Sequence, residues 1–358
     1  MKKVNKSVKA YKGFNKYMQC TPNGEIFQYE IGKEYKEDEA NLCHCGFHAC
    51  ENPLDVLSYY NNIDDKFCEV ELDEIDPNRN RDSKICGKKI KIGIEIGFLG
   101  LFKAGIEWIK NKTIFTKEDF KKLPSGHNAK IGSSGNDAKI GSSGDGVKIG
   151  SSGDGAKIGS SGDHARIGSS GDYVQIGSSG DDAKISSSGN YAQIGSSGYN
   201  VKIGSSGDDA KIGSSSDNAK IGSSGDGAKI GSSGDYVQIG SSGNYAQIGS
   251  SGYNVQIGSS GDYVQIGSFG HNAKIGSSGD DAKIGSSGDD CVIMCAGINS
   301  SAKAKIGSWI TLAEWKYSEE KQKYIPFSVV TKQVDGIEIK EDVYYTLQDG
   351  KFKESEQQ

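Results

Sequence analysis

Five residues of the types that bind zinc lie within one short stretch: Cys43, His44, Cys45, His48 and Cys50. A structural zinc ion is usually held by two separated pairs of such ligands. Here there is no pattern of paired Cys-x2-Cys motifs, and five residues so close together cannot all turn toward one point. We therefore assign no metal, keep Cys43, Cys45, His48 and Cys50 only as zinc candidates, and expect free thiols.

A second set of candidates comes from a nine-residue phrase, GSSGDxAKI, that fills about half the chain. Where the residue three before isoleucine is tyrosine, the residue just before isoleucine is glutamine, whereas Asp or Gly there accompanies Lys or Arg. If both positions face solvent, a tyrosine ring can stack over a glutamine amide and an aspartate can neutralise a lysine. Duplication of a block of sequence explains the same pairing. The candidate binding residues are Tyr173, Gln175, Tyr191, Gln193, Tyr236, Gln238, Tyr245, Gln247, Tyr263 and Gln265.

The aspartate of the phrase raises the question of calcium, because calcium-binding nonapeptides also carry one aspartate per unit. That position is occupied instead by His127, Asn136, Tyr199, Tyr253 or His271 in several units. A continuous row of carboxylate ligands is therefore not expected. The sequence predicts no cofactor.

Catalytic motifs give no clear enzyme. There is no GxSxG, no Walker loop and no HExxH. The order YKGF, GFHA, Tyr59-Tyr60 and Glu69-Val-Glu71 is faintly similar to the split sheet of ADP-ribosyltransferases. It lacks the first-strand Arg or His and the Ser-Thr-Ser strand of that fold. We therefore expect a non-enzymatic protein and keep an ADP-ribosyltransferase-like or ligand-binding head as an alternative.

The repeat is the element that must position the outward residues. Isoleucine recurs every nine residues from Ile131 to Ile293, which makes nineteen units, and Ala, Val or Cys291 stands two residues before it. The AKI triplet thus alternates inward, outward, inward, as a strand does, and the Gly-Ser tetrad supplies a turn. One unit is too short to close a coil, so two or three must combine, and we favour two. Because this core is thin, we expect stability from stacking, backbone ladders and serine hydroxyl networks.

The predicted fold is mainly β, a parallel β-solenoid with an N-terminal α+β domain, a helical lid and a C-terminal β cap. Alternating residues predict strands that begin at Phe67 and Ile90, and Asn52-Pro53 predicts a helix over about 53–60. A second short helix is expected to begin at Thr116. The expected domains are an α+β head (1–96), a helical lid (97–124), the solenoid (125–307) and a β cap (308–358), in which Asp335-Gly336 and Asp349-Gly350 form hairpin turns.

Composition and apolar content indicate which classes of partner the chain is not expected to bind. The 358 residues carry a net charge of -5 with both signs well represented, so bulk charge predicts no nucleic-acid partner. No apolar run is long enough for a membrane span, and the basic start is not followed by the apolar segment of a signal peptide. We expect an unexported chain without a membrane, whose oligomeric state is open.

Several motifs together resemble an uncharacterised family of phage and prophage proteins: YKGF, CGFHACENPLDV, GIEW, nonapeptide repeats, LAEW and YTLQDGKF. The resemblance covers essentially the whole chain and implies an origin in a bacterial virus or prophage, with a place in the host-cell cytoplasm or the virion. It brings no activity and no catalytic residue. The expected role is a structural or interaction protein whose repetitive face binds or spaces an unknown protein or polymer. An inhibitor of host defence is a further alternative.

Overall fold

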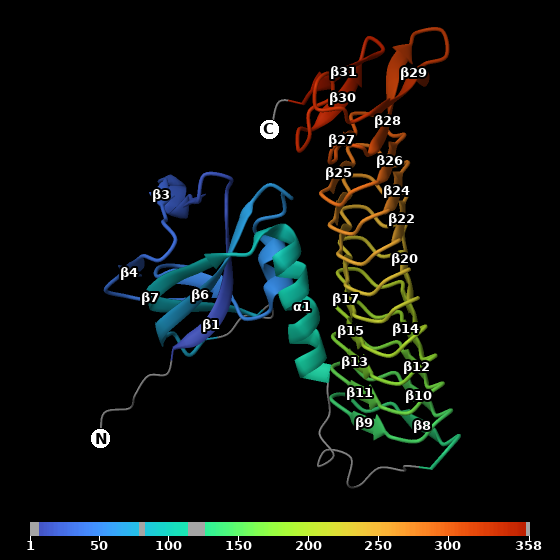
Figure 1. Ribbon diagram of the computed structural model, residues 1–358. Coiled ribbons are helices and arrows are strands. Elements are labelled where there is room, and N and C mark those ends of the chain that lie inside the picture. Colours follow the sequence, from blue (N-terminus) through green and yellow to red (C-terminus); the bar gives the residue numbers. More distant parts are fainter. Residues whose placement is uncertain (1–6, 79–82, 114–125, 356–358) are drawn as a thin grey trace. The chain divides into compact units, whose positions relative to one another are not determined.

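The computed structural model describes residues 7–78, 83–113 and 126–355 (Figure 1). The chain divides into two compact units, Met1–Trp108 and Ile109–Gln358, each of which we describe by itself. Among the described residues, no helix is both long and apolar enough to cross a membrane.

The first unit is built on an antiparallel sheet that closes on itself, because β7 pairs with β5 and β4 along one edge and with β6 along the other. Its strands are β1 (Val8–Phe14), β4 (Glu34–Lys36), β5 (Phe47–Cys50), β6 (Lys66–Ile75) and β7 (Lys84–Glu95), accompanied by β2 (Gln19–Cys20), β3 (Phe27–Gln28) and the 3₁₀ helices η1 (Pro22–Gly24) and η2 (Pro53–Ser58). The strands predicted to begin at Phe67 and Ile90 are confirmed within β6 and β7. The predicted helix is the 3₁₀ helix η2, and the Asn52 side chain accepts from the Leu54 N–H at 3.1 Å.

Helix α1 (Gly97–Thr113) follows β7. Its Phe98 ring lies 6.2 Å from the Phe67 ring, which explains why Phe67 is buried although it lies on the same side of β6 as the solvent-facing Glu71. Gly105 approaches Leu54 so closely that a Cβ would meet it at 2.5 Å. The predicted helix is therefore present, and these contacts pack it on the head; its role as a lid stays a prediction. The second helix, predicted from Thr116, lies outside the described residues.

The second unit is a parallel β-solenoid with two repeats per coil, as predicted (Figure 1). Each strand pairs in register with the strand 18 residues later, for example Ile149 with Ile167. The even sheet contains β8 (Lys130–Ser133), β10 (Lys148–Ser151), β12 (Arg166–Ser169), β14 (Lys184–Ser187), β16 (Lys202–Ser205), β18 (Lys220–Ser223), β20 (Gln238–Ser241), β22 (Gln256–Ser259), β24 (Lys274–Ser277) and β26 (Val292–Cys295). The odd sheet contains β9 (Lys139–Ser142), β11 (Lys157–Ser160), β13 (Gln175–Ser178), β15 (Gln193–Ser196), β17 (Lys211–Ser214), β19 (Lys229–Ser232), β21 (Gln247–Ser250), β23 (Gln265–Ser268), β25 (Lys283–Ser286) and β27 (Ser301–Lys303).

The interior of each coil is thin, as the sequence indicates. Ile203 and Ile212 are buried from opposite sheets of one coil, together with Val201 and Ala210. The first serine of each pair also points inward, but most of these hydroxyls, including those of Ser205 and Ser223, have no hydrogen-bond partner among the described residues. The expected network of serine hydroxyls is therefore wrong for these positions, where serine acts as a small side chain that fits the narrow core.

The turns explain why the phrase needs its second glycine. A Cβ on Gly207 would lie 2.1 Å from the carbonyl oxygen of Gly189 in the preceding coil. The following aspartate ties coils together, since Asp145 Oδ1 accepts the backbone N–H of Asp163 at 3.0 Å. These two contacts recur along the rod, so coil spacing depends on the turns as well as on the strands.

The cap continues both sheets and then closes them, and the predicted C-terminal strands are confirmed. Strand β28 (Trp309–Ser318) stacks on β26 and forms a hairpin with β29 (Lys323–Gln333), while β30 (Tyr345–Gln348) pairs with β27 and β31 (Lys351–Glu354). Asp349-Gly350 forms the predicted hairpin turn between β30 and β31. Asp335-Gly336 does not join paired strands; it begins a loop in which Asp335 Oδ1 accepts three backbone N–H groups.

Candidate functional site

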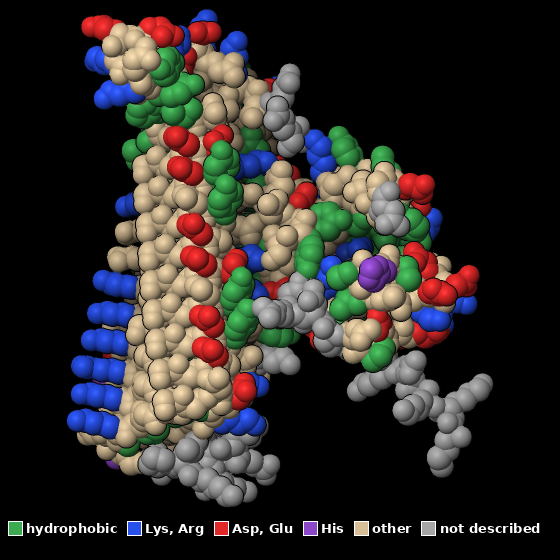
Figure 2. Space-filling model, turned by 180° about the vertical axis from the view of Figure 1, so that it is seen from behind, with side chains coloured by type: hydrophobic (Ala, Val, Ile, Leu, Met, Phe, Trp, Pro, Cys, Tyr) green, Lys and Arg blue, Asp and Glu red, His purple; other side chains and the backbone are tan. Residues whose placement is uncertain are grey.

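The most regular chemical feature of the solenoid is a row of cations on the outer surface of the even sheet. Six consecutive strands place Lys or Arg at the same register position, and each of these side chains is exposed. We call them the cation row: Lys130, Lys148, Arg166, Lys184, Lys202 and Lys220. Figure 2 shows Lys and Arg side chains as a column along one edge of the solenoid. Strands in a sheet lie ~4.8 Å apart, so these like charges repel one another in the absence of a counter-anion.

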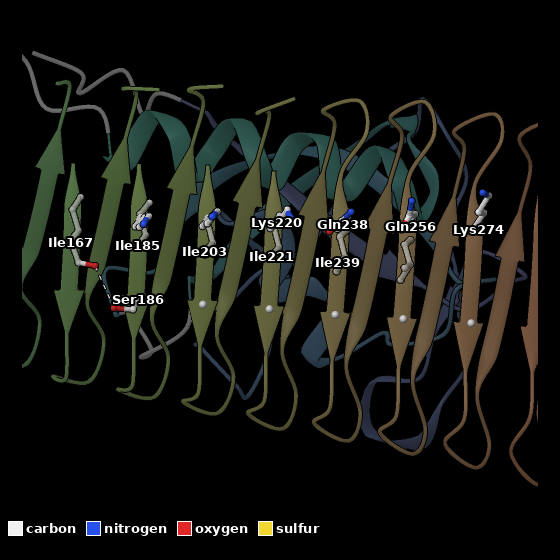
Figure 3. A pocket seen from close by; sticks show the side chains of 18 of the residues that line it. Ile167, Ile185, Ser186, Ile203, Lys220, Ile221, Gln238, Ile239, Gln256 and Lys274 are labelled. Atoms are coloured by element: carbon white, nitrogen blue, oxygen red, sulfur yellow. Dashed lines mark hydrogen bonds between the residues drawn. The ribbon is translucent and has the colours of Figure 1, made fainter. Parts of the chain in front are cut away.

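A shallow groove of about 1280 Å³ runs along this surface. Its wall continues beyond the cation row with Gln238, Gln256 and Lys274, which Figure 3 shows on successive strands. The outward glycines make the surface flat, because Gly204 and Gly222 have open space where a Cβ would stand. A second hollow of about 810 Å³ is lined by glycines and serines of the same strands and by the exposed serines that follow them, as at Ser188, Ser206 and Ser224.

The predicted Tyr and Gln candidates do not form one surface. Tyr236 and Gln238 belong to the even sheet, and the other eight residues belong to the odd sheet. Tyrosine stacks on tyrosine of the next coil, not on a glutamine amide: the rings of Tyr173 and Tyr191 lie 4.9 Å apart at 5°, and a second such pair, Tyr245 and Tyr263, lies 5.1 Å apart at 7°. Figure 2 shows hydrophobic side chains beside a column of acidic ones along the solenoid.

These tyrosines also occupy an unfavourable backbone conformation. Tyr173 and Tyr245 both have φ of 57°, a left-handed value that disfavours residues with a Cβ, and glycine takes the equivalent turn position at Gly155 and Gly227. A stacked aromatic pair contributes ~0.5–1.5 kcal/mol, which offsets part of the ~1–2 kcal/mol that each of its two left-handed residues costs. The stacking is therefore a structural reason for the tyrosines that requires no ligand.

Sequence reasoning missed the cation row because it treated all repeats as one series. When alternate units are separated, as a coil of 18 residues requires, Lys or Arg is unbroken from Lys130 to Lys220 in one sheet, whereas Lys and Gln alternate in pairs in the other. Within the cation row, only Lys184 has an aspartate, Asp182, at the position expected to neutralise it. None of the ion pairs found among residues 7–78, 83–113 and 126–355 involves a member of the row.

The zinc candidates lie within β5 and in the turn just before it, but they do not converge. Cys43 is exposed, and its backbone N–H donates to Nε2 of His48 at 2.9 Å. Cys86 donates its thiol to the carbonyl of Cys45 at 3.0 Å, and Cys50 is buried. Within the described parts of the chain, no three His, Cys, Asp or Glu side chains come together as metal ligands would. All eight cysteines are free thiols, as expected.

The contact between His48 and Cys43 makes the head sensitive to acid. Burial, followed by the charges of Lys84 and Lys12, lowers the pKa of His48 to about 4, from an ordinary value of about 6.5. The unfolded chain therefore binds a proton below about pH 6.5 that the folded head excludes until about pH 4. The contribution of His48 to stability is complete above pH 6.5 and is lost as the pH falls toward 4.

We expect the amides of residues 43–50 to lose protection from hydrogen exchange between pH 7 and pH 4.5, after correction for the intrinsic exchange rate. A protonated imidazole cannot accept the Cys43 N–H. In His48→Gln, the side-chain oxygen can still accept that bond and does not titrate, so the loss should be smaller. Equal pH dependence in both proteins would contradict this role for His48.

The head also contains a pocket of about 290 Å³. The sequence motifs YKGF, GFHAC and Tyr59-Tyr60, which lie far apart in the chain, all contribute to its wall. Lys12 reaches across the wall to donate to the carbonyl of His48 at 3.0 Å. Residues from these motifs that line the pocket are Tyr11, Lys12, Gly13, Gly46, His48, Ala49, Cys50, Tyr59 and Tyr60. Glu69, the other candidate in the head, pairs with Lys9 at 2.8 Å.

The head is the part of the chain that a known family covers. Residues 8–104 match a domain of unknown function, DUF7666. The match ends within α1, in agreement with the packing of that helix on the head. No curated protein and no solved structure matches the chain.

Proposed function

We propose that this chain is a non-enzymatic interaction protein whose solenoid binds an extended partner along the outer surface of the even sheet. The observation that carries the proposal is the cation row beside a shallow groove that spans many coils. A surface that repeats one arrangement at every coil suits a partner that repeats as well, because many weak contacts then act together. The resemblance to phage and prophage proteins supports a role in the virion or in an infected host cell.

Two deletions of equal length test where binding occurs. Removal of residues 145–216 takes out four coils and four members of the cation row, whereas removal of 217–288 takes out four coils and only Lys220. Both remove whole coils, so the remaining strands keep their sheets. Binding to a panel of polymers would be measured by biolayer interferometry: polygalacturonate, oligo(dT), polyglutamate and neutral dextran.

We expect at least one charged polymer to bind the full chain, and the first deletion to weaken this binding more than the second. Binding that survives both deletions unchanged would place the activity in the head and overturn the proposal. Failure of every polymer to bind the full chain would overturn it as well.

The head pocket favours a second candidate function, in which the head binds a small ligand and the solenoid acts as a spacer. Its support is that the motifs of the matched domain line one cavity. Native mass spectrometry of the purified chain should then detect a retained small molecule. Thr21→Trp, at the exposed edge of the pocket, should reduce the retained fraction.

A further inference from the structure

We propose that the partner on the even sheet is a linear acidic polysaccharide that carries about one negative group per sugar. This inference rests on the proposed function and names the chemistry of the polymer. It concerns the groove beside Lys148, Arg166, Lys184, Lys202 and Lys220.

Charge is the first argument. The cation row places one exposed positive side chain on each successive strand, at intervals of ~4.8 Å. None of the described ion pairs neutralises these side chains, and they project from one sheet in a straight line. Separate small anions would each make only one or two weak contacts with such a row. A linear polyanion can contact all six cations at once.

Spacing is the second argument. The rise per sugar of an extended polysaccharide chain is comparable to the distance between adjacent strands, which is ~4.8 Å. Successive sugars of an extended chain are rotated about its axis, so a polymer with one carboxylate per sugar presents charges on one side at small multiples of this interval. Lysine side chains are long and flexible, so they can reach carboxylates that lie between these positions.

The floor of the groove is the third argument. Gly150, Gly204 and Gly222 have open space on the outer side, so a flat sugar ring can approach the backbone. Two residues after each of these glycines, the second serine of the pair provides an exposed hydroxyl, as at Ser206 and Ser224. One coil therefore offers a cation for the acidic group and a hydroxyl for the hydroxyls of the sugar.

The same surface is poorly suited to nucleic acid. Single strands are usually held on aromatic side chains against which successive bases stack. Between β8 and β18, the outward positions of the even sheet hold Lys or Arg followed by Gly or Ser, and no aromatic side chain occurs among them. Duplex DNA curves its phosphates around a cylinder, so a straight row of cations meets them only where the strands cross the row.

The test compares two variants with the same change in net charge. In the even-sheet variant, Lys148, Arg166, Lys184 and Lys202 are replaced by Gln; in the odd-sheet variant, Lys139, Lys157, Lys211 and Lys283 are replaced by Gln. Glutamine occurs naturally at the same position on both sheets, at Gln238 and Gln175, so both variants should fold. Circular dichroism verifies this, and binding to polygalacturonate is measured at several salt concentrations.

We expect the even-sheet variant to bind polygalacturonate on the order of tenfold more weakly, with a reduced dependence on salt. The odd-sheet variant should stay within about threefold of the natural chain. Equal weakening in both variants would show binding through bulk charge and would overturn the inference. If oligo(dT) or polyglutamate binds and polygalacturonate does not, the inference falls while the proposed function stands; if no polymer binds, both fall.

Discussion

Deletion of residues 181–189 should weaken binding of polygalacturonate far more than deletion of residues 181–198, although the second deletion is twice as long. Both remove the same charged residues, Asp181, Asp182 and Lys184, so the change in net charge is identical. The two deletions differ in whether they remove a whole coil. The shorter deletion removes one repeat, half a coil, and so moves every later strand to the opposite sheet.

The consequences for the cation row differ accordingly. After the shorter deletion, Arg166 is followed on its sheet by Gln193, and the longest unbroken row contains three cations. After the longer deletion, Arg166 is followed by Lys202, and five cations remain in line. Both proteins should retain the β-sheet signal in circular dichroism, because every coil still contains two equivalent repeats. Equal affinity of both proteins would show that the arrangement of the cations on one sheet does not matter.

Gly207→Ala should markedly lower the stability of the solenoid. Its new Cβ would lie 2.1 Å from the Gly189 carbonyl oxygen, which belongs to the backbone of the preceding coil and cannot turn aside. Overpacking of this kind costs ~1–3 kcal/mol. A lower midpoint of thermal or denaturant unfolding, followed by circular dichroism, would measure the effect.

Gly204→Ala is the matched control, because it makes the same chemical change in the same coil where no atom lies within 4 Å. Its midpoint should equal or exceed that of the natural chain. At the position equivalent to Gly207 in a neighbouring unit, the chain carries the buried Ser216, so one Cβ can be accommodated by local adjustment. We therefore expect destabilisation and not failure to fold. Equal midpoints for the two variants would contradict the close approach of the turns.

The solenoid could be predicted from the sequence because its information is local and repeated. A fixed isoleucine with a small residue two places earlier determines which side of the strand is buried, and Ile203 and Val201 are buried as that pattern requires. The C-terminal strands were predictable without a repeat, from the alternation of residues along each of them. The choice of two repeats per coil then determines which units share a sheet.

The rest depends on contacts that the pattern does not encode. Phe67 lies on the same side of its strand as Glu69 and Glu71 and yet is buried, because Phe98 of α1 packs against it from another element. The His48 contact with Cys43 depends on a turn in which Cys43 takes φ of 69°. The sequence offered these residues only as zinc candidates with unsuitable spacing, and it gave no sign of this contact. The cation row was visible in the sequence only after alternate repeats were assigned to separate sheets. The head pocket requires strands far apart in the chain, so single motifs could not reveal it.

The spacing of the stacked tyrosine pairs indicates how many repeats can be added to the solenoid without changing its surfaces. The pair Tyr173–Tyr191 recurs 72 residues later as Tyr245–Tyr263, which is four whole coils, and so returns to the same sheet. An odd number of inserted repeats would have turned everything beyond it by half a revolution and mixed the surfaces. Along each sheet of the solenoid, equivalent positions recur at a constant interval of ~4.8 Å. The solenoid can be lengthened without altering what either side displays only when repeats are gained two at a time.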